Sequence, residues 1–352
     1  MLNDVIDGKF RLEERLGQGR GGGTVYRAEC VKEPSKKVVA LKYPASPVEL
    51  EALQAIKERD PSCLGVKPLL SSGTFAGKPY LATEVLGPSL AQVFEKLGAC
   101  EEELRWEVVR LVGRMLLRRL EAIHRCGVVH GDVAPLNILL GEAACGGTGV
   151  FFVDFGSAQP FPGGEPVMPF WSTVEFNSVF VVDGAVRGPR DDLESLGYVL
   201  CHGLYGELPW FNLLQAGPWE GKSRDEACER AREAKTQLLY GTWAALGLEW
   251  THFMHMPKEL GKFLRACACR KDGEDSSPDY AALASLLGGG EGAGETEDCA
   301  LLREVLQHLK LQHLLPRRPA TISLPKAYAH LAKEVVPRGV NGPSRPLEAS
   351  RW

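Results

Sequence analysis

Five short motifs follow one another in a fixed order along this chain of 352 residues. The first is rich in glycine, the next two are single charged residues, and the last two combine acidic residues with glycine. In chain order they are Leu16 to Tyr26 (LGQGRGGGTVY), Lys42, Glu49, His130-Gly131-Asp132 followed by Asn137, and Asp154-Phe155-Gly156. Motifs this far apart can act together only if the fold returns the chain to one place several times.

The pattern of apolar residues predicts two lobes of different structure. Early segments alternate apolar and polar residues around glycine turns, whereas the middle of the chain has longer stretches with a 3.6-residue period. We therefore expect an α+β protein with a β-rich lobe at about 8–86 and a larger helical lobe at about 87–287. The expected elements are strands over 38–41, 138–140 and 150–153, and helices over 48–56, 101–123 and 190–204.

The composition changes after Leu287. The run GGGEGAGETED over 288–298 predicts a flexible acidic linker, so the folded core is expected to end near Leu287. A helical extension is expected over 299–336, and the residues from Pro337 to 352 have the composition of a disordered tail. The pattern leaves open whether the helix packs on the core, binds a partner or does neither. Its apolar face consists of Leu301, Leu302, Val305, Leu306 and Leu309.

The overall composition excludes several classes of protein. A hydrophobic content of 44% with 24% charged residues is typical of a globular chain, and a net charge of −4 gives no general attraction to nucleic acid or membranes. Of the ten cysteines, only Cys267 and Cys269 lie close in sequence, and their spacing matches no common zinc or redox motif. We expect reduced, packed thiols. The first residues lack a signal-peptide pattern, which predicts an intracellular protein, cytoplasmic or nuclear, with no membrane span.

The glycine-rich turn has two interpretations. Between two strands, glycines let backbone N–H groups approach a phosphate without interference from a Cβ atom. A merely flexible hairpin would have the same composition, so the turn alone does not decide between them. The four motifs that follow it favour the phosphate-binding interpretation, because together they supply the parts used in phosphoryl transfer by protein kinases.

From about Gly8 to Leu287 the sequence resembles the protein kinase superfamily, and more narrowly its casein kinase I and vaccinia-related kinase branch. Gly131 in His-Gly-Asp and the Thr-Val-Glu-Phe segment resemble the vaccinia-related side, and, as in that branch, no Ala-Pro-Glu closes the activation segment. The resemblance implies a two-lobed kinase fold that uses ATP and Mg²⁺ and acts on Ser or Thr hydroxyls of proteins. The segments that carry the narrower resemblance are 84–90 (EVLGPSL), 172–176 (STVEF), 190–198 (RDDLESLGY) and 278–280 (PDY).

This resemblance assigns roles to the charged residues. Lys42 would contact the α- and β-phosphates and Glu49 would hold Lys42, although Glu51 on the same short helix is an alternative. Asp132 would accept or orient the proton of the acceptor hydroxyl. Asn137 and Asp154 would supply oxygen ligands to Mg²⁺. Without the resemblance, a surface lysine and turn-capping Asp and Asn residues would explain the same positions.

Further residues acquire a place by the same resemblance. Thr173 would contact Asp132 and shape the acceptor site, Thr83 would guard the nucleotide pocket, and Asp192 would support the catalytic loop. The residues expected to surround the nucleotide are Leu16, Gly17, Gly19, Gly23, Val25, Ala40, Glu84, Leu86 and Leu139. Ordinary core packing would explain the apolar members of this set equally well.

Three departures from the family pattern bear on activity. Ala134 stands where Ser/Thr kinases usually have a lysine, and Leu136 stands where tyrosine kinases have a compensating arginine. Loss of one preorganised electrostatic donor lowers kcat by about 10²- to 10³-fold. The glycine-rich loop is one residue longer than usual, and Gly131 replaces the arginine that docks an activation-loop phosphate. Two functions are therefore favoured: an attenuated Ser/Thr protein kinase, or an ATP-binding pseudokinase that acts as a scaffold or allosteric partner. A small-molecule kinase on the same fold is disfavoured, because the segment from Thr173 to Phe176 resembles a peptide-binding wall.

Two other groups of residues are interpreted without a functional role. His252 and His255 have no accompanying ligands in sequence, so we interpret them as packing residues and not as a metal site. Arg114, Arg118 and Arg119 are expected on the solvated face of their helix. The sequence predicts protein substrates and says nothing about oligomeric state.

Overall fold

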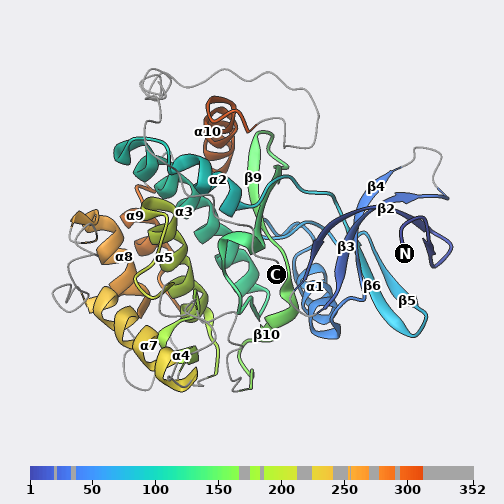
Figure 1. Cartoon of the computed structure of the whole chain (residues 1–352), viewed down its shortest axis with the longest axis horizontal. Coiled ribbons are helices and arrows are strands. Elements are labelled where there is room, and N and C mark those ends of the chain that lie inside the picture. Colours follow the sequence, from blue (N-terminus) through green and yellow to red (C-terminus); the bar gives the residue numbers. More distant parts are fainter. Residues whose placement is uncertain are drawn as a thin grey trace.

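The computed structural model describes residues 1–19, 22–32, 37–165, 175–182, 186–211, 224–240, 253, 255–268, 277–289 and 294–311. These residues form a β-rich lobe and a helical lobe, shown on the right and left of Figure 1. The predicted α+β class and the two-lobed arrangement are confirmed.

The N-terminal lobe is a six-stranded antiparallel sheet in the order β1-β2-β3-β4-β6-β5. Alternation along β4 directs Val39 and Leu41 into the core of this lobe, so Ala40 and Lys42 face the other way. The strands are β1 (Val5–Ile6), β2 (Phe10–Gln18), β3 (Thr24–Cys30), β4 (Val38–Tyr43), β5 (Ser71–Phe75) and β6 (Lys78–Thr83).

Helix α1 (Pro47–Arg59) connects the sheet to the second lobe. It begins at a proline, which suits the first helical turn because proline has no N–H to leave unpaired. Leu53 and Ile56 are buried in the same apolar core as the helices of the second lobe. Glu49, in the first turn, is also buried, whereas Glu51 is exposed.

The C-terminal lobe is built around two long helices, α3 (Glu102–Arg125) and α5 (Pro189–Tyr205). A hairpin of β8 (Ile138–Glu142) and β9 (Thr148–Phe152) packs on α3, and β7 (Val128–Val129) pairs with β10 (Gln159–Pro160). These elements agree with the predicted ones to within a few residues. The remaining described elements are α2 (Leu90–Leu97), η1 (Pro135–Asn137), η2 (Phe155–Ser157), α4 (Val179–Val182), α7 (Arg224–Tyr240), α8 (Lys258–Ala268) and α9 (Tyr280–Leu286).

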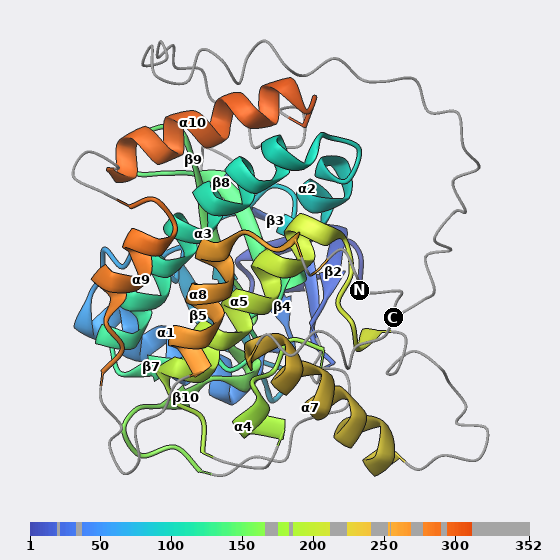
Figure 2. The ribbon, with the colours of Figure 1, turned by 90° about the vertical axis from the view of Figure 1, so that its left-hand side faces the viewer.

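Helix α10 (Glu295–His308) packs on α3 and β9 along one side of this lobe (Figure 2). Its first four residues were predicted as the end of the acidic linker, and Glu295, Glu297 and Asp298 belong to its first turn. Negative charge in a first turn is favourable because the helix dipole is positive there. The helix buries Leu302 and Leu306, so the apolar core extends beyond Leu287. The predicted extension beyond Leu311 and the predicted tail lie outside the described residues.

The interpretation of the α3 arginines as solvated was wrong. Arg114 and Arg119 are 5% and 1% exposed, and both face α10. Arg114 donates to Asp298 at 2.8 Å and to the Leu287 carbonyl at 3.0 Å. Arg119 donates to Glu295 at 2.7 Å. These arginines could not be recognised as buried from their own helix, because the acidic partners lie far along the chain.

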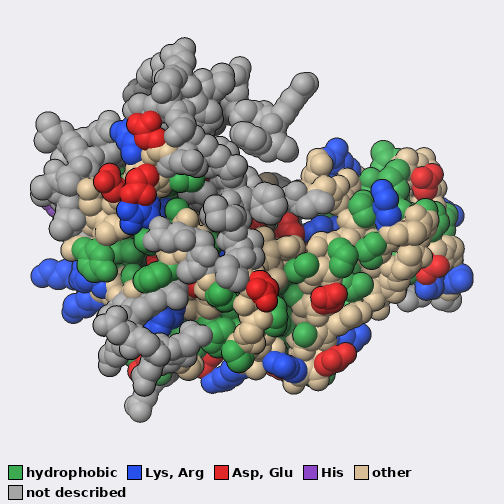
Figure 3. Space-filling view, turned by 90° about the horizontal axis from the view of Figure 1, so that it is seen from below, with side chains coloured by type: hydrophobic (Ala, Val, Ile, Leu, Met, Phe, Trp, Pro, Cys, Tyr) green, Lys and Arg blue, Asp and Glu red, His purple; other side chains and the backbone are tan. Residues whose placement is uncertain are grey.

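Among the described residues, no helix is long and apolar enough to cross a membrane. The nine described cysteines are free thiols, as predicted, and five of them are buried. On the face shown in Figure 3, the described acidic and basic side chains are interspersed with apolar ones, and no extended patch of one charge is visible.

Candidate active site

Lys42, at the end of β4, contacts two carboxylates from different elements. Its Nζ lies 2.5 Å from Glu49 Oε2 on α1 and 2.8 Å from Asp154 Oδ1 after β9. Burial by itself would lower the pKa of Lys42, but the two carboxylates outweigh this effect and raise the pKa above its usual value. Lys42 is therefore a fixed cation that joins the sheet, α1 and the C-terminal lobe.

Asp154 has an uncommon backbone conformation. It lies in the left-handed region with φ 61° and ψ 68°, which a residue other than glycine enters at a cost. The next residue, Phe155, is buried and packs its ring against His130, with the ring centroids 4.6 Å apart. The backbone of Phe155 also hydrogen-bonds Glu49. These contacts fix the turn that carries the Asp154 carboxylate toward Lys42.

The glycine-rich turn lies directly over this ion-paired group. A Cβ atom on Gly19 would be 2.7 Å from Lys42 Cε and 3.5 Å from Asp154 Oδ2. A Cβ atom on Gly23 would be 2.1 Å from the Pro44 carbonyl oxygen, which no real contact allows. The close approach of the backbone therefore requires glycine at both positions. Arg20 and Gly21 at the tip lie outside the described residues.

Asp132 and Asn137 face each other across the loop that precedes β8. The Asn137 amide Nδ2 donates to Asp132 Oδ2 at 2.7 Å and to the Asp132 carbonyl at 2.9 Å. The Asn137 carbonyl accepts from the Val153 N–H at 3.0 Å, which places Asn137 beside the residue that precedes Asp154. Three oxygen-bearing side chains, from Asp132, Asn137 and Asp154, thus come from two neighbouring strand ends.

Asp192, near the start of α5, holds the backbone of the loop at His130 and Gly131. Its carboxylate accepts the backbone N–H groups of His130 at 2.7 Å and Gly131 at 2.9 Å, and it lies 2.9 Å from His124 Nε2. Complete burial would raise the pKa of Asp192, but the hydrogen bonds and charges of its partners lower it below the usual value. Asp192 therefore remains an anion that orients the loop, in the supporting position that the sequence predicted.

Arg187 was not singled out by sequence reasoning, although it lies against the same loop. It is 5% exposed and donates to the Ser157 carbonyl at 3.2 Å. A Cβ atom on Gly131 would lie 3.1 Å from Arg187 Nη1 and 2.4 Å from the Ser157 carbonyl. Burial lowers the pKa of Arg187, while the charges of Asp192, Asp132 and Asp191 oppose this effect. The space that Gly131 leaves is thus used by a cation from another segment.

Half-buried apolar side chains lie beside the charged group. Val25 on β3 is paired with Lys42, and Ala40 is paired with Thr83, so all four residues share one face of the sheet. Leu139 on β8 and Leu86 in the connection between the lobes are also half-buried. The backbone there is held by a bond from Gly87 N–H to the Leu140 carbonyl at 2.6 Å.

The other predicted nucleotide-site residues lie at the edges of this region. Leu16, at the end of the glycine-rich strand, is 45% exposed, and Gly17 pairs with Val25. Glu84 is exposed and lies 3.0 Å from Lys67, so its side chain turns away toward the surface. Of the predicted residues, Lys42, Glu49 and Asp154 are in contact and Asp132 is bonded to Asn137, whereas Leu16 and the Glu84 side chain lie toward the surface. Thr173 lies outside the described residues.

Ala134 and Leu136 lie in the same loop in different surroundings. Ala134 is 3% exposed, whereas Leu136 is 64% exposed. His255 is exposed, and His252 lies outside the described residues.

A model of the protein kinase domain family matches residues 10–277 of the chain. The chain belongs to this family. The match starts at the first residue of β2 and spans all five motifs, while α9 and α10 follow it. The kinase domain explains why the lysine, the two acidic motifs and the glycine-rich turn converge, since phosphoryl transfer depends mainly on positioning and charge.

Proposed function

We propose that this kinase domain transfers the γ-phosphoryl group of ATP to Ser or Thr hydroxyls of protein substrates. We also propose that it belongs to the casein kinase I and vaccinia-related branch, on the motifs described above. The observation that carries the proposal is the contact of Lys42 with both Glu49 and Asp154 directly under Gly19. A lysine held by two carboxylates beneath a glycine turn can offer its charge to a phosphate without reorganisation.

The residues present fit a Mg²⁺–nucleotide complex. The absence of a Cβ atom on Gly19 keeps the backbone close to Lys42 and Asp154, and backbone N–H groups in such a turn favour an anion. Asn137 and Asp154 offer the oxygen ligands that Mg²⁺ prefers. When bound, Mg²⁺ neutralises charge on the phosphates. Within the chain, Glu49 holds Lys42 in place and Phe155 holds the turn of Asp154.

The proposed role of Asp132 is to orient the acceptor hydroxyl and accept its proton. Asn137 holds one carboxylate oxygen of Asp132 at 2.7 Å, which limits rotation of the side chain. Asp192 fixes the backbone N–H of Gly131, and Arg187 packs beside Gly131 and donates to the Ser157 carbonyl, so they are positioning residues and not catalytic ones. A carboxylate held in this way pays little entropy when a hydroxyl group arrives.

The half-buried apolar face supports an adenine site. Val25, Ala40 and Leu139 are neither exposed nor part of the two apolar cores found among the described residues. Apolar side chains that the protein itself leaves partly uncovered beside a phosphate-binding group are typical of a ligand pocket. This exposure favours the pocket over ordinary core packing, which was the alternative at these positions.

A second function, binding of nucleotide without transfer, is favoured by one observation. Ala134 supplies no cation next to Asp132, and Leu136 supplies none two residues later. Arg187 lies near Asp132, but it is buried against Gly131 and Ser157. In this second function the domain would act as a scaffold whose conformation responds to ATP. The intact lysine and acidic motifs favour transfer, with kcat reduced by about 10²- to 10³-fold.

The experiment is Mg²⁺-dependent transfer of phosphate from ATP to casein and to the chain itself. The wild type is compared with Asp132→Asn and with Leu136→Arg, which adds a cation at an exposed position. Loss of transfer in Asp132→Asn with unchanged nucleotide binding, and a gain in Leu136→Arg, would support a weak kinase. Nucleotide binding with no transfer by the wild type or by Leu136→Arg would support the scaffold instead. Phosphoamino-acid analysis of the product tests the Ser/Thr preference.

A further inference from the structure

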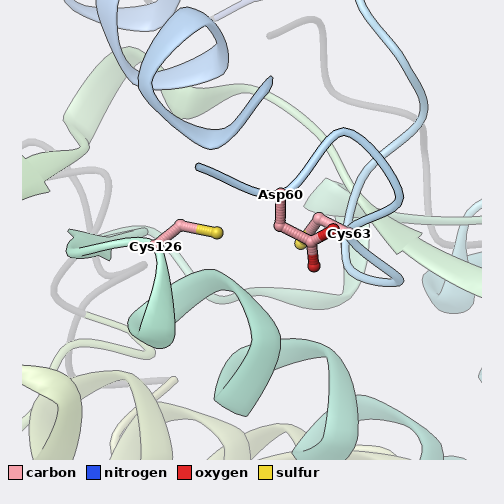
Figure 4. Close-up of side chains that lie close together, drawn as sticks. All are labelled: Asp60, Cys63 and Cys126. Carbon is pink, nitrogen blue, oxygen red and sulfur yellow. The ribbon is translucent and has the colours of Figure 1, made fainter. Parts of the chain in front are cut away.

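Three potential metal ligands meet where the helices α1 and α3 end. Asp60 is the residue that caps the C-terminus of α1, Cys126 caps the C-terminus of α3, and Cys63 lies in the turn after α1. One ligand atom from each lies within 4.8 Å of the others. Figure 4 shows the Cys126 sulfur directed toward Asp60 and Cys63. Cys63 and Cys126 are 6% and 2% exposed, while Asp60 is half-buried.

We propose that Asp60, Cys63 and Cys126 form a binding site for a thiophilic divalent cation, with Zn²⁺ as the best chemical match. Zinc accepts thiolate and carboxylate ligands together, whereas Mg²⁺ and Ca²⁺ select oxygen ligands alone. Tetrahedral Zn–S bonds of about 2.3 Å place two sulfurs about 3.8 Å apart, which requires little movement of the present side chains. A water molecule would complete four ligands from the half-buried Asp60 side.

The electrostatic surroundings favour a cation. The C-terminal ends of α1 and α3 both point toward the cluster, and each helix dipole is negative at that end. Arg59 donates to the Cys126 carbonyl at 2.8 Å, so one positive charge already lies at the negative end of α3. Two thiolates and one carboxylate carry three negative charges, so one divalent cation together with Arg59 neutralises the site. Binding releases the two thiol protons to solvent.

Two of the three ligands are already oriented by hydrogen bonds from the turn that follows α1. Ser62 donates to Asp60 Oδ1 from its backbone N–H at 3.0 Å and from its Oγ at 2.8 Å. The backbone of Gly65 hydrogen-bonds the Cys63 sulfur. In both cases the donor lies two residues after the ligand. Such outer contacts fix ligand orientation in metal sites, and their presence here distinguishes the turn from a chance meeting of side chains.

A second group of similar composition lacks these properties. Cys145, Glu295 and Cys299 also lie within 4.8 Å of one another. However, the Glu295 carboxylate is occupied by Arg118 and Arg119, so two positive charges stand where a metal ion would bind. Both groups bring three potential ligands close together, so proximity alone is not the reason for proposing a metal site at Asp60, Cys63 and Cys126. The first cluster differs in that its carboxylate forms no ion pair among the described contacts and in that two of its ligands are oriented by the turn after α1.

The test is the metal content and metal affinity of the full chain. Protein produced with Zn²⁺ in the medium is purified by gel filtration and analysed by mass spectrometry for bound metal, and its affinity is measured by competition with a chromophoric chelator. The variants are Cys63→Ser, Cys126→Ser and Asp60→Asn, and the matched control is Cys201→Ala, another buried cysteine. Circular dichroism identifies the variants that fold. Asp60→Asn is included because Asp60 is only half-buried, so this variant should fold even if the cysteine variants do not.

We expect one Zn²⁺ per wild-type chain, retained in Cys201→Ala. Each ligand variant should lose at least about tenfold in affinity, because even outer-contact changes weaken metal sites by that factor. Cobalt bound in place of zinc should show thiolate charge-transfer absorption that disappears in Cys63→Ser. The proposal is overturned if folded wild type holds no stoichiometric zinc, if the ligand variants bind as tightly as the control, or if peptide mapping finds a Cys63–Cys126 disulfide. None of these measurements depends on kinase activity.

Discussion

Removal of the Asp298 charge should release helix α10 from the kinase domain. Asp298 is 3% exposed, and its two oxygens lie 2.8 Å from Arg114 and 2.5 Å from Arg118. In Asp298→Asn the shape is kept, but the Arg114 side chain, 6% exposed, loses its compensating charge. Breaking a buried ion pair on one side costs about 3–5 kcal/mol. We expect about 3 kcal/mol, because Arg118 is 26% exposed and can turn to solvent.

Hydrogen exchange of the α10 amides measures this loss directly. A loss of about 3 kcal/mol corresponds to exchange roughly 100-fold faster over Glu295–His308. Glu297→Gln is the matched control, because Glu297 lies in the same first turn but is exposed, and it should change the free energy by less than about 0.5 kcal/mol. The double variant Asp298→Asn with Arg114→Met should recover part of the loss, since it removes the unpaired charge.

The reasoning about α10 would be refuted by either of two results. One is a change below about 1 kcal/mol in Asp298→Asn, which is the range of an exposed ion pair. The other is strict additivity of the Asp298 and Arg114 substitutions, which would mean that the two side chains do not interact energetically.

Three further outcomes follow from single residues. Gly131→Ala should destabilise the domain by more than about 1 kcal/mol, measured by urea unfolding, because φ is +75° and the added Cβ would meet the Ser157 carbonyl at 2.4 Å. Burial would raise the pKa of Glu295, but Arg119 outweighs this effect and lowers the pKa to about 2. The ionised Glu295 carboxylate therefore stabilises the fold above pH 4.5, and this contribution is lost as the pH falls toward 2. Glu295→Gln should flatten that part of a stability–pH profile. Burial lowers the pKa of His202 to about 4. Between pH 6.5 and about 4, His202 is therefore protonated in the unfolded chain but neutral in the folded chain. Stability should fall by about 3 kcal/mol as the pH decreases through that range, and His202→Gln should remove this slope.

The elements that carry the candidate site residues could be predicted because these residues lie at or near the ends of regular elements. Lys42 follows the short apolar run of β4, and Asp154 comes shortly after the apolar run of β9, so the elements that carry them could be predicted from local patterns, while their roles came from the resemblance to protein kinases. The sequence left Glu51 as an alternative to Glu49, and the structure places Glu49 against Lys42 while Glu51 is exposed. By contrast, the burial of the arginines on α3 could not be predicted from the sequence of that helix. Its arginines are buried only because an acidic helix much later in the chain covers them.

The same limit applies to the cysteines. Their spacing gave no metal motif, because Cys63 and Cys126 lie on different elements and the third ligand is an aspartate. A search for paired cysteines within a few residues cannot find a site that is assembled by two helix ends. Sequence reasoning therefore works where the chemistry is local to one turn or one strand, and fails where the fold supplies the neighbour.

Gly131 and Arg187 are best understood as one feature. Taken alone, Gly131 suggests the loss of a cation from the catalytic loop. In the structure Arg187 lies against the space above Gly131 and faces the charges of Asp132, Asp191 and Asp192. A larger residue at 131 would displace that arginine and leave three carboxylates without it. The loop thus keeps a cation, supplied from the segment before α5, and the electrostatic deficit of this kinase domain is confined to Ala134 and Leu136 among the described loop residues. Restoring charge at Leu136, and not at Gly131, is therefore the change that should raise phosphate transfer.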